Sequence, residues 1–172
     1  MSGLHILAIY ANKQDMFTHA LHYLKEGLDN NEAVLLVTDL FSLNMAYLIM
    51  SDLWGKDCSR CWVENKDFSI VNISKLNVAS KSVSGGIIIP LIKHLSESVL
   101  EKRRRGFRIF ADLGVMFQNG LIKRVMECES DFQTMPDSLK IVCGYLQSEI
   151  IDLNSKKFAY LQQRHNHVYV IP

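Results

Sequence analysis

The sequence predicts an α/β fold in which helices cover both faces of a mostly parallel central sheet. Short runs of mainly apolar residues alternate along the chain with longer segments whose apolar residues recur at helical spacing. Strands buried on both faces carry such continuous apolar runs, and the helices that cross between them make neighbouring strands parallel. A length of 172 residues matches one domain. We therefore expect a single three-layer α/β/α domain over residues 1–172.

The first part of the chain predicts a strand, a helix and a second strand. Residues 4–10 form a nearly continuous apolar run, which indicates a buried strand. Asn12 then offers a side-chain cap for a helix whose apolar residues share one face. Gly27 and the turn residues 29–31 are expected to end that helix. A second buried strand is expected at 33–38.

The middle of the chain predicts an apolar helix, a strand and a loop. A helix is expected over 42–54, and Gly55 would end it. This helix is apolar nearly all round, so residues 45–50 are a candidate surface for a homo-oligomer. Alternating apolar residues at 68–73 indicate a more exposed strand. Residues 80–86 are the most loop-like stretch and a candidate cover for a pocket.

The last part of the chain predicts three strands separated by helices. A long helix is expected to end at Arg105, with Gly106 as its cap. Further along, apolar runs indicate strands and helical spacing indicates helices. The strands are expected at 107–112, 139–143 and 167–171, and the helices at 120–133 and 148–164.

Charge and composition argue against several classes of protein. The chain has 19 Lys+Arg and 18 Asp+Glu, a formal net charge of +1, which does not favour a general nucleic-acid binder. No run approaches the ~18 apolar residues of a membrane-spanning helix, and the start of the chain lacks the pattern of a signal peptide. Four cysteines without such a signal favour reduced thiols and a cytoplasmic location.

Residues 20–38 resemble the opening of RecA-like ATPases of the circadian-clock type, the P-loop NTPase-like topology. In those proteins the first strand leads into a phosphate-binding loop, whose chemistry needs glycines, a lysine and a hydroxyl. The matching stretch here, 10–18, has no glycine and no Gly-Lys-Ser/Thr. Asp112 stands in the place of the magnesium-associated acid, but one acid does not restore phosphate binding. The resemblance therefore implies a RecA-like core without its phosphate loop, and ATP hydrolysis is disfavoured.

Four short motifs extend a resemblance over nearly the whole chain. In their order and spacing they resemble the MEDS family, sensory domains named from methanogens and from a dichloromethane-responsive regulator. Leu146 stands where the family usually has an acid, and either of two histidines could match its terminal histidine. The motifs are His5-Ile6-Leu7-Ala8-Ile9-Tyr10, Cys128-Glu129-Ser130-Asp131-Phe132, Cys143-Gly144-Tyr145 and Arg164-His165-Asn166-His167-Val168.

The MEDS resemblance implies a non-catalytic sensory domain, archaeal or bacterial, that binds a small organic molecule and signals through a partner protein. It implies no cofactor. Ligands of parallel sheets bind beyond the carboxyl ends of the strands, which adds residues at those ends to the motif residues. The candidate ligand-binding residues are Tyr10, Asp39, Asp112, Glu129, Cys143, Tyr145, His5 and His165.

Three of these residues have an ordinary structural interpretation beside the functional one. His5 begins its strand, so a hydrogen-bonded core histidine is as good an interpretation as a ligand contact. Glu129 falls on the apolar stripe of its helix, where a carboxylate needs a partner or takes up a proton. Cys143 also fits as a small buried apolar residue.

Two further patterns leave other functions open. Cys58 and Cys61 form a C-x-x-C, which occurs in metal and redox sites, although the sequence shows no second pair to complete a zinc set. The run Lys102-Arg103-Arg104-Arg105 would suit an acidic partner, or would complement the dipole at the end of a helix. A nucleotide-binding pseudo-ATPase that keeps a base pocket is the remaining alternative.

Overall fold

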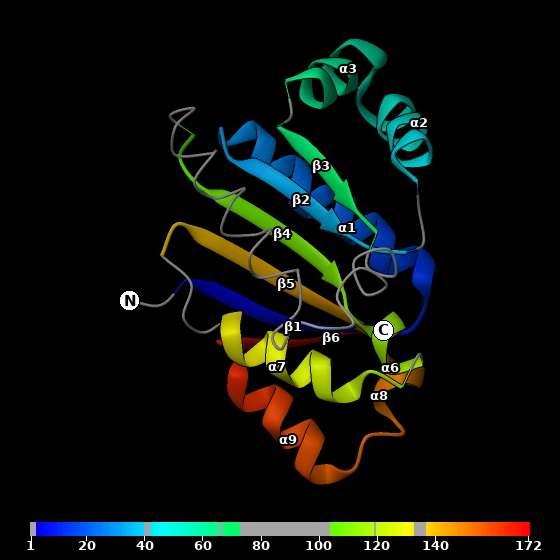
Figure 1. Ribbon diagram of the computed structural model, residues 1–172. Helices are drawn as coiled ribbons and strands as arrows, with labels where there is room; N and C mark the ends of the chain where they lie inside the picture. The colour runs from blue at the N-terminus through cyan, green and yellow to red at the C-terminus, as the bar shows by residue number, and fades with distance from the viewer. Residues whose placement is uncertain (1–2, 40–41, 66, 73–103, 119, 133–136) are drawn as a thin grey trace.

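A six-stranded sheet, parallel throughout, forms the middle of the described part of the computed structural model (Figure 1). The strand order is β3-β2-β4-β5-β1-β6, and helices cover both faces. The predicted three-layer α/β/α arrangement is therefore confirmed. The structure describes residues 3–39, 42–65, 67–72, 104–118, 120–132 and 137–172.

The strands closely follow the predicted apolar runs, and β5 extends beyond its predicted end to Leu146. The strands are β1 (Leu4–Tyr10), β2 (Ala33–Val37), β3 (Phe68–Val71), β4 (Phe107–Asp112), β5 (Leu139–Leu146) and β6 (His167–Ile171). The helices are α1 (Lys13–Asp29), α2 (Leu43–Trp54), α3 (Lys56–Glu64), α6 (Gly114–Gln118), α7 (Ile122–Phe132), α8 (Gln147–Ile150) and α9 (Ser155–Arg164).

Alternate residues of each strand contribute to two separate apolar cores. In β1, Leu7 and Ile9 belong to the core that α6, α7 and α9 cover. Ala8 and Tyr10 belong to the opposite core, which α1 and α2 cover. Because both faces are buried, the central strands carry continuous apolar runs rather than an alternating pattern.

Several helices differ from the sequence prediction. The segment expected to be mostly helical over 148–164 forms two helices, because Asn154 starts a new one: its side chain accepts a hydrogen bond from Lys157 N at 3.0 Å. Helices α3 and α6 were not predicted, and α7 begins at Ile122 rather than at residue 120. Short helices of this kind are easily missed because they hold too few residues to show a helical period.

The predicted helix end at Arg105 is wrong in its last two residues. Arg104 and Arg105 are not helical, and Arg105 N donates a hydrogen bond to Asn31 O at 3.0 Å. Gly106 leads directly into β4 instead of capping a helix. The rest of that predicted helix, with the loop predicted at 80–86, lies outside the described residues.

Gly27 does not end its helix as predicted. Helix α1 continues through this glycine to Asp29. A Cβ atom at Gly27 would lie 2.9 Å from Val34 Cγ1 and 3.0 Å from Arg108 Cδ. The glycine is therefore needed because α1 packs closely on the sheet, and a side chain there would collide with β2 and β4.

One helix presents apolar side chains to solvent. In α2, the side chains of Leu43, Met45 and Leu48 are exposed. The use of this helix as an assembly surface stays a prediction. Within the described residues, every helix is too short or too polar to cross a membrane.

Gly27→Ala should destabilise the fold by about 1–3 kcal/mol, because the new methyl group overpacks against stiff Val34 and buried Arg108. Urea unfolding measures this change. Thr18→Ala, an exposed position in the same helix, is the control and should stabilise α1 slightly. A stabilised Gly27→Ala protein would contradict the close packing described here.

Candidate functional site

A cluster of polar side chains is buried between the sheet and helices α7 and α9. Strand pairing places Leu7 of β1 opposite Cys143 of β5, so His5, Cys143 and Tyr145 share one face of the sheet. Glu129 lies on the inner side of α7, fully buried at 0% exposure. His165 follows the end of α9 and precedes β6.

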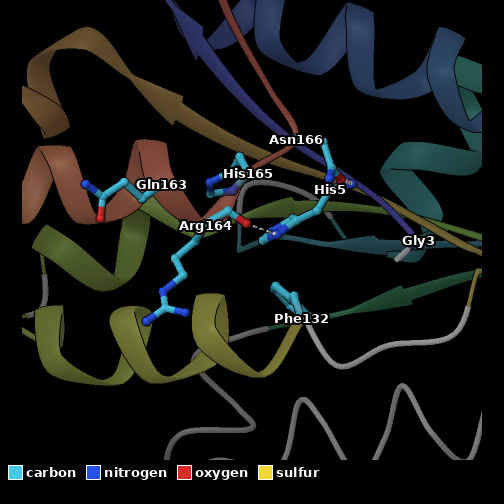
Figure 2. A pocket seen from close by; sticks show the side chains of 7 residues that line it. All are labelled: Gly3, His5, Phe132, Gln163, Arg164, His165 and Asn166. Atoms are coloured by element: carbon cyan, nitrogen blue, oxygen red, sulfur yellow. Dashed lines mark hydrogen bonds between the residues drawn. The ribbon is translucent and has the colours of Figure 1, made fainter. Parts of the chain in front are cut away.

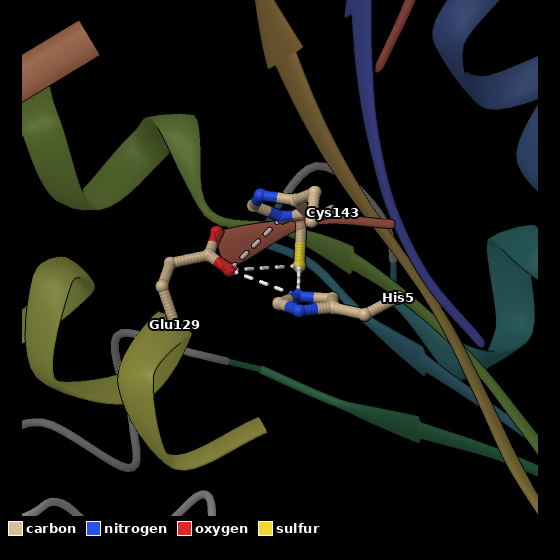
Figure 3. Close-up of side chains that lie close together, drawn as sticks. His5, Glu129 and Cys143 are labelled. Carbon is tan, nitrogen blue, oxygen red and sulfur yellow. Dashed lines mark hydrogen bonds and ion pairs between the residues drawn. The ribbon is translucent and has the colours of Figure 1, made fainter. Parts of the chain in front are cut away.

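The Glu129 carboxylate is the centre of this cluster (Figure 3). Its Oε2 atom lies 3.0 Å from His5 Nε2 and 3.1 Å from His165 Nε2. The thiol of Cys143 donates to the same oxygen at 3.6 Å. The hydroxyl of Tyr145 donates to the other oxygen, Oε1. We call these five residues the Glu129 cluster.

Backbone carbonyls fix the other nitrogen of each histidine. His5 Nδ1 donates to Arg164 O at 2.9 Å, and His165 Nδ1 donates to Leu161 O at 2.6 Å. Each ring therefore directs Nε2 toward Glu129. Asn166 adds two hydrogen bonds of 2.7 Å with the backbone of His5, which join β1 to the segment before β6.

Burial and charge act in opposite directions on the pKa of Glu129, and in the same direction on the pKa values of Cys143 and Tyr145. Burial alone would raise the pKa of Glu129, but its interactions with His165 and His5 outweigh burial and lower the pKa to about 2. Burial and the nearby Glu129 charge raise the pKa of Cys143 and the pKa of Tyr145 well above their ordinary values. Glu129 is therefore an anion beside a neutral thiol and a neutral phenol.

A pocket of about 310 Å³ opens beside the two histidines (Figure 2). It lies at the amino ends of β1 and β6, whereas the sequence argument placed a pocket at the carboxyl ends. Phe132, at the end of α7, forms another wall. The lining residues are Gly3, His5, Phe132, Gln163, Arg164, His165 and Asn166.

The structure brings together five of the eight candidate residues, which are the members of the Glu129 cluster. It also distinguishes the two C-terminal histidines, because His165 is buried in the cluster whereas His167 is exposed on β6. Tyr10, Asp39 and Asp112 lie at the opposite, carboxyl end of the sheet. The ligand-binding role of all eight stays a prediction.

Tyr10 packs in the core under α1 rather than facing the Glu129 cluster. Its ring contacts His19 edge-on at a centroid distance of 5.7 Å, and burial raises the pKa of Tyr10 to about 12. Asp39 is half-buried just beyond β2.

Asp112 is a buried acid at the carboxyl end of β4. Thr38 Oγ1 donates to its Oδ2 at 3.2 Å. Burial, with the charge of nearby Glu149, raises the pKa of Asp112 to about 7. Glu149 lines a second cavity of about 270 Å³ and accepts a hydrogen bond from Leu146 N at 2.8 Å.

The position of a phosphate loop is occupied by a tight turn. Only Ala11 and Asn12 separate β1 from α1, and Asn12 Oδ1 caps the helix by accepting from Asp15 N at 2.9 Å. A phosphate loop needs several more residues with free backbone amides. Loss of the phosphate loop stays a prediction, made from the missing glycines of residues 10–18.

The two other candidate motifs lie apart from the Glu129 cluster. Cys58 and Cys61 are exposed on α3, and the metal-ligating group found among the described residues does not include them. Arg104 forms an ion pair with Asp67 and a hydrogen bond with Asn31, so its guanidinium has partners within the chain. Lys102 and Arg103 lie outside the described residues.

Sequence reasoning missed the pocket and the convergence of the cluster on one carboxylate oxygen. Phe132 and Asn166 stand within two of the four motifs and Gln163 precedes the last one, but nothing in the motifs marks them as lining residues, because they meet only when α7, α9 and β1 are packed. Beside the motif resemblance, Glu129 was a signal of its own, because it is a carboxylate on the apolar stripe of a helix.

Two comparisons find similarity to known proteins. A family model described as MEDS, "MEthanogen/methylotroph, DcmR Sensory domain", matches residues 4–152. Among solved structures, the flagellar accessory protein FlaH from Methanocaldococcus jannaschii superposes with a TM-score of 0.57 at 11% identity, covering 99% of this chain and 72% of that one. This likeness concerns the fold and confirms the predicted RecA-like topology. No curated protein sequence matches significantly.

Asp112→Asn should stabilise the protein increasingly as pH rises. The folded-state pKa of about 7 exceeds the ordinary value of 3.8, so unfolding releases a proton between these values and wild-type stability falls with pH. The variant should gain up to about 4 kcal/mol at pH 8 and nothing below about pH 4. Urea unfolding at pH 4, 6 and 8 measures the difference. Asp152→Asn, at an exposed site, is the control, and a pH-independent gain for Asp112→Asn would contradict the raised pKa.

Tyr145→Phe should cost about 1–3 kcal/mol of unfolding free energy, because a buried carboxylate oxygen loses its hydroxyl donor. Thermal or urea unfolding measures the loss. Tyr169→Phe removes a hydroxyl from a residue that is 51% exposed and should change stability by less than about 0.5 kcal/mol. Equal effects of the two substitutions would show that the bond to Glu129 contributes nothing.

Proposed function

We propose that the chain, which belongs to the MEDS family, is a non-catalytic sensory domain that binds a small polar organic molecule in the pocket beside His5 and His165. The family supplies the sensory role, since its description is that of a sensory domain. The pocket at the edge of the Glu129 cluster is the proposed binding site for that molecule. The bound molecule acts by changing the interaction with a partner protein.

The observation that carries the proposal is the direct contact between a pocket and a buried charged cluster. His5 and His165 line the pocket and also contact Glu129. A molecule in the pocket therefore meets polar ring edges whose positions depend on a buried anion. Pockets that bind small molecules usually place a few fixed polar groups in this way.

The size and lining of the pocket indicate the class of ligand. A volume of about 310 Å³ is at the lower end for ligand sites. Side-chain amides from Gln163 and Asn166 offer hydrogen bonds, and the rings of His5, His165 and Phe132 form walls of the pocket. These features favour a short-chain alcohol, aldehyde or carboxylate over a nucleotide.

The pocket joins elements that are far apart in the sequence. His5 belongs to β1, Phe132 ends α7, and residues 163–166 connect α9 to β6. A ligand that contacts all three restrains α9 and β6 relative to the sheet. Since β6 is an edge strand with exposed Tyr169 and Val170, it is the element best placed to report occupancy to a partner.

Titration with ethanol, acetaldehyde, acetate and their three- and four-carbon homologues tests the proposal. At least one compound should raise the free energy of unfolding, by about 3 kcal/mol at 100 times its Kd. Calorimetry should give one site per chain. ATP with Mg²⁺ should not bind, because the β1–α1 turn leaves no phosphate loop.

Two tryptophan variants locate the binding site. Gln163→Trp fills the pocket from α9 and should abolish binding, whereas Gln162→Trp, exposed on the same helix but outside the pocket, should leave it unchanged. Binding that survives Gln163→Trp would move the site elsewhere. Tight, magnesium-dependent ATP binding would favour the nucleotide alternative.

A further inference from the structure

Four side chains of the Glu129 cluster point metal-ligating atoms at one place. His5, Glu129, Cys143 and His165 each offer one such atom, and these atoms lie within 4.8 Å of one another. Neighbouring pairs are 3.0 Å (His5–Glu129), 3.1 Å (His165–Glu129), 3.4 Å (His5–Cys143) and 3.6 Å (Cys143–Glu129) apart. Zinc–ligand bonds of 2.0–2.3 Å place the corners of a tetrahedral site about 3.3–3.8 Å apart. The observed spacing is close to those edges.

Hydrogen bonding already prepares both histidines for a cation. Each Nδ1–H donates to a backbone carbonyl, which leaves a lone pair on Nε2 of the neutral ring. Metal-ligating histidines in proteins are fixed by this kind of outer bond. Two lone pairs directed at a carboxylate oxygen repel it unless a proton or a metal ion lies between them.

His165 gives independent support for a cation at this place. Its side chain is fully buried, at 0% exposure, and Nε2 lies 3.1 Å from Glu129 Oε2. The two atoms form an ion pair when the ring is protonated, but they lie too far out of line for a directed hydrogen bond. Two ligands of one ion lie in this way, close to each other without a hydrogen bond between them.

We infer that His5, Glu129, Cys143 and His165 form a zinc-class binding site that holds one divalent transition-metal ion. Two imidazole nitrogens, one thiolate and one carboxylate oxygen are the donors that Zn²⁺ prefers, whereas Mg²⁺ and Ca²⁺ prefer sites made of oxygen alone. Binding deprotonates the Cys143 thiol and releases that proton to solvent. Tyr145 orients the carboxylate through its second oxygen.

The metal site goes beyond the proposed sensory function and does not depend on it. The four ligands come from β1, α7, β5 and the segment between α9 and β6, so the ion joins these elements with or without a molecule in the pocket. A protein that binds metal but no organic molecule, or the reverse, would separate the two proposals.

Metal titration of the full chain tests the inference. Protein freed of metal with a chelator should bind one Zn²⁺, measured by calorimetry and native mass spectrometry. One Co²⁺ should bind in its place and give the intense visible bands of a tetrahedral site with the ultraviolet charge-transfer band of a cobalt–thiolate bond. Failure of the folded wild-type chain to bind either ion would overturn the inference.

Cysteine variants identify the thiolate. Cys143→Ser should abolish the charge-transfer band and weaken Zn²⁺ binding more than about 100-fold, since even outer-shell changes cost 10–100-fold. Cys58→Ser with Cys61→Ser removes the exposed C-x-x-C and should keep the band. If Cys143→Ser does not fold, the band in the Cys58/Cys61 double variant still decides: its presence supports the buried site, and its loss assigns the metal to α3 and overturns the inference.

Discussion

The fully buried carboxylate of Glu129 is the constraint on which this half of the molecule depends. A charge removed from water is costly unless it is paired and hydrogen-bonded. Here the pairing partners come from elements that are distant in sequence: β1, β5 and the segment that precedes β6. The packing of α7 on the sheet therefore depends on these ion pairs and hydrogen bonds of Glu129. The two histidines that take part in them also form the inner wall of the pocket.

The two ends of the sheet have different chemistry. At the carboxyl ends, where ligands of RecA-like and other parallel-sheet proteins usually bind, the β1–α1 turn is short and Asp112 is buried with a raised pKa. Toward the amino ends of β1 and β6, two histidines and Asn166 line a pocket. A RecA-like fold in this chain thus has a polar pocket away from the edge where a nucleotide would bind.

The sequence predicted the layers and most strands because burial on both faces produces continuous apolar runs. It could not predict α3 and α6, which are too short for a period, or the helical Gly27, whose role depends on contact with Val34 and Arg108. The motif resemblance named all five members of the Glu129 cluster. Their convergence could not be predicted, since it depends on the register between β1 and β5 and on where α9 ends.

The most direct test of the central claim, that the Glu129 cluster is a binding site rather than a purely structural network, is anomalous diffraction at the zinc edge. Crystals should be grown from protein purified without chelators and supplied with Zn²⁺. The account predicts one strong anomalous peak within bonding distance of His5 Nε2, His165 Nε2, Cys143 Sγ and a Glu129 oxygen. A well-ordered cluster with no peak among these atoms, its histidines hydrogen-bonded to Glu129 alone, would contradict it.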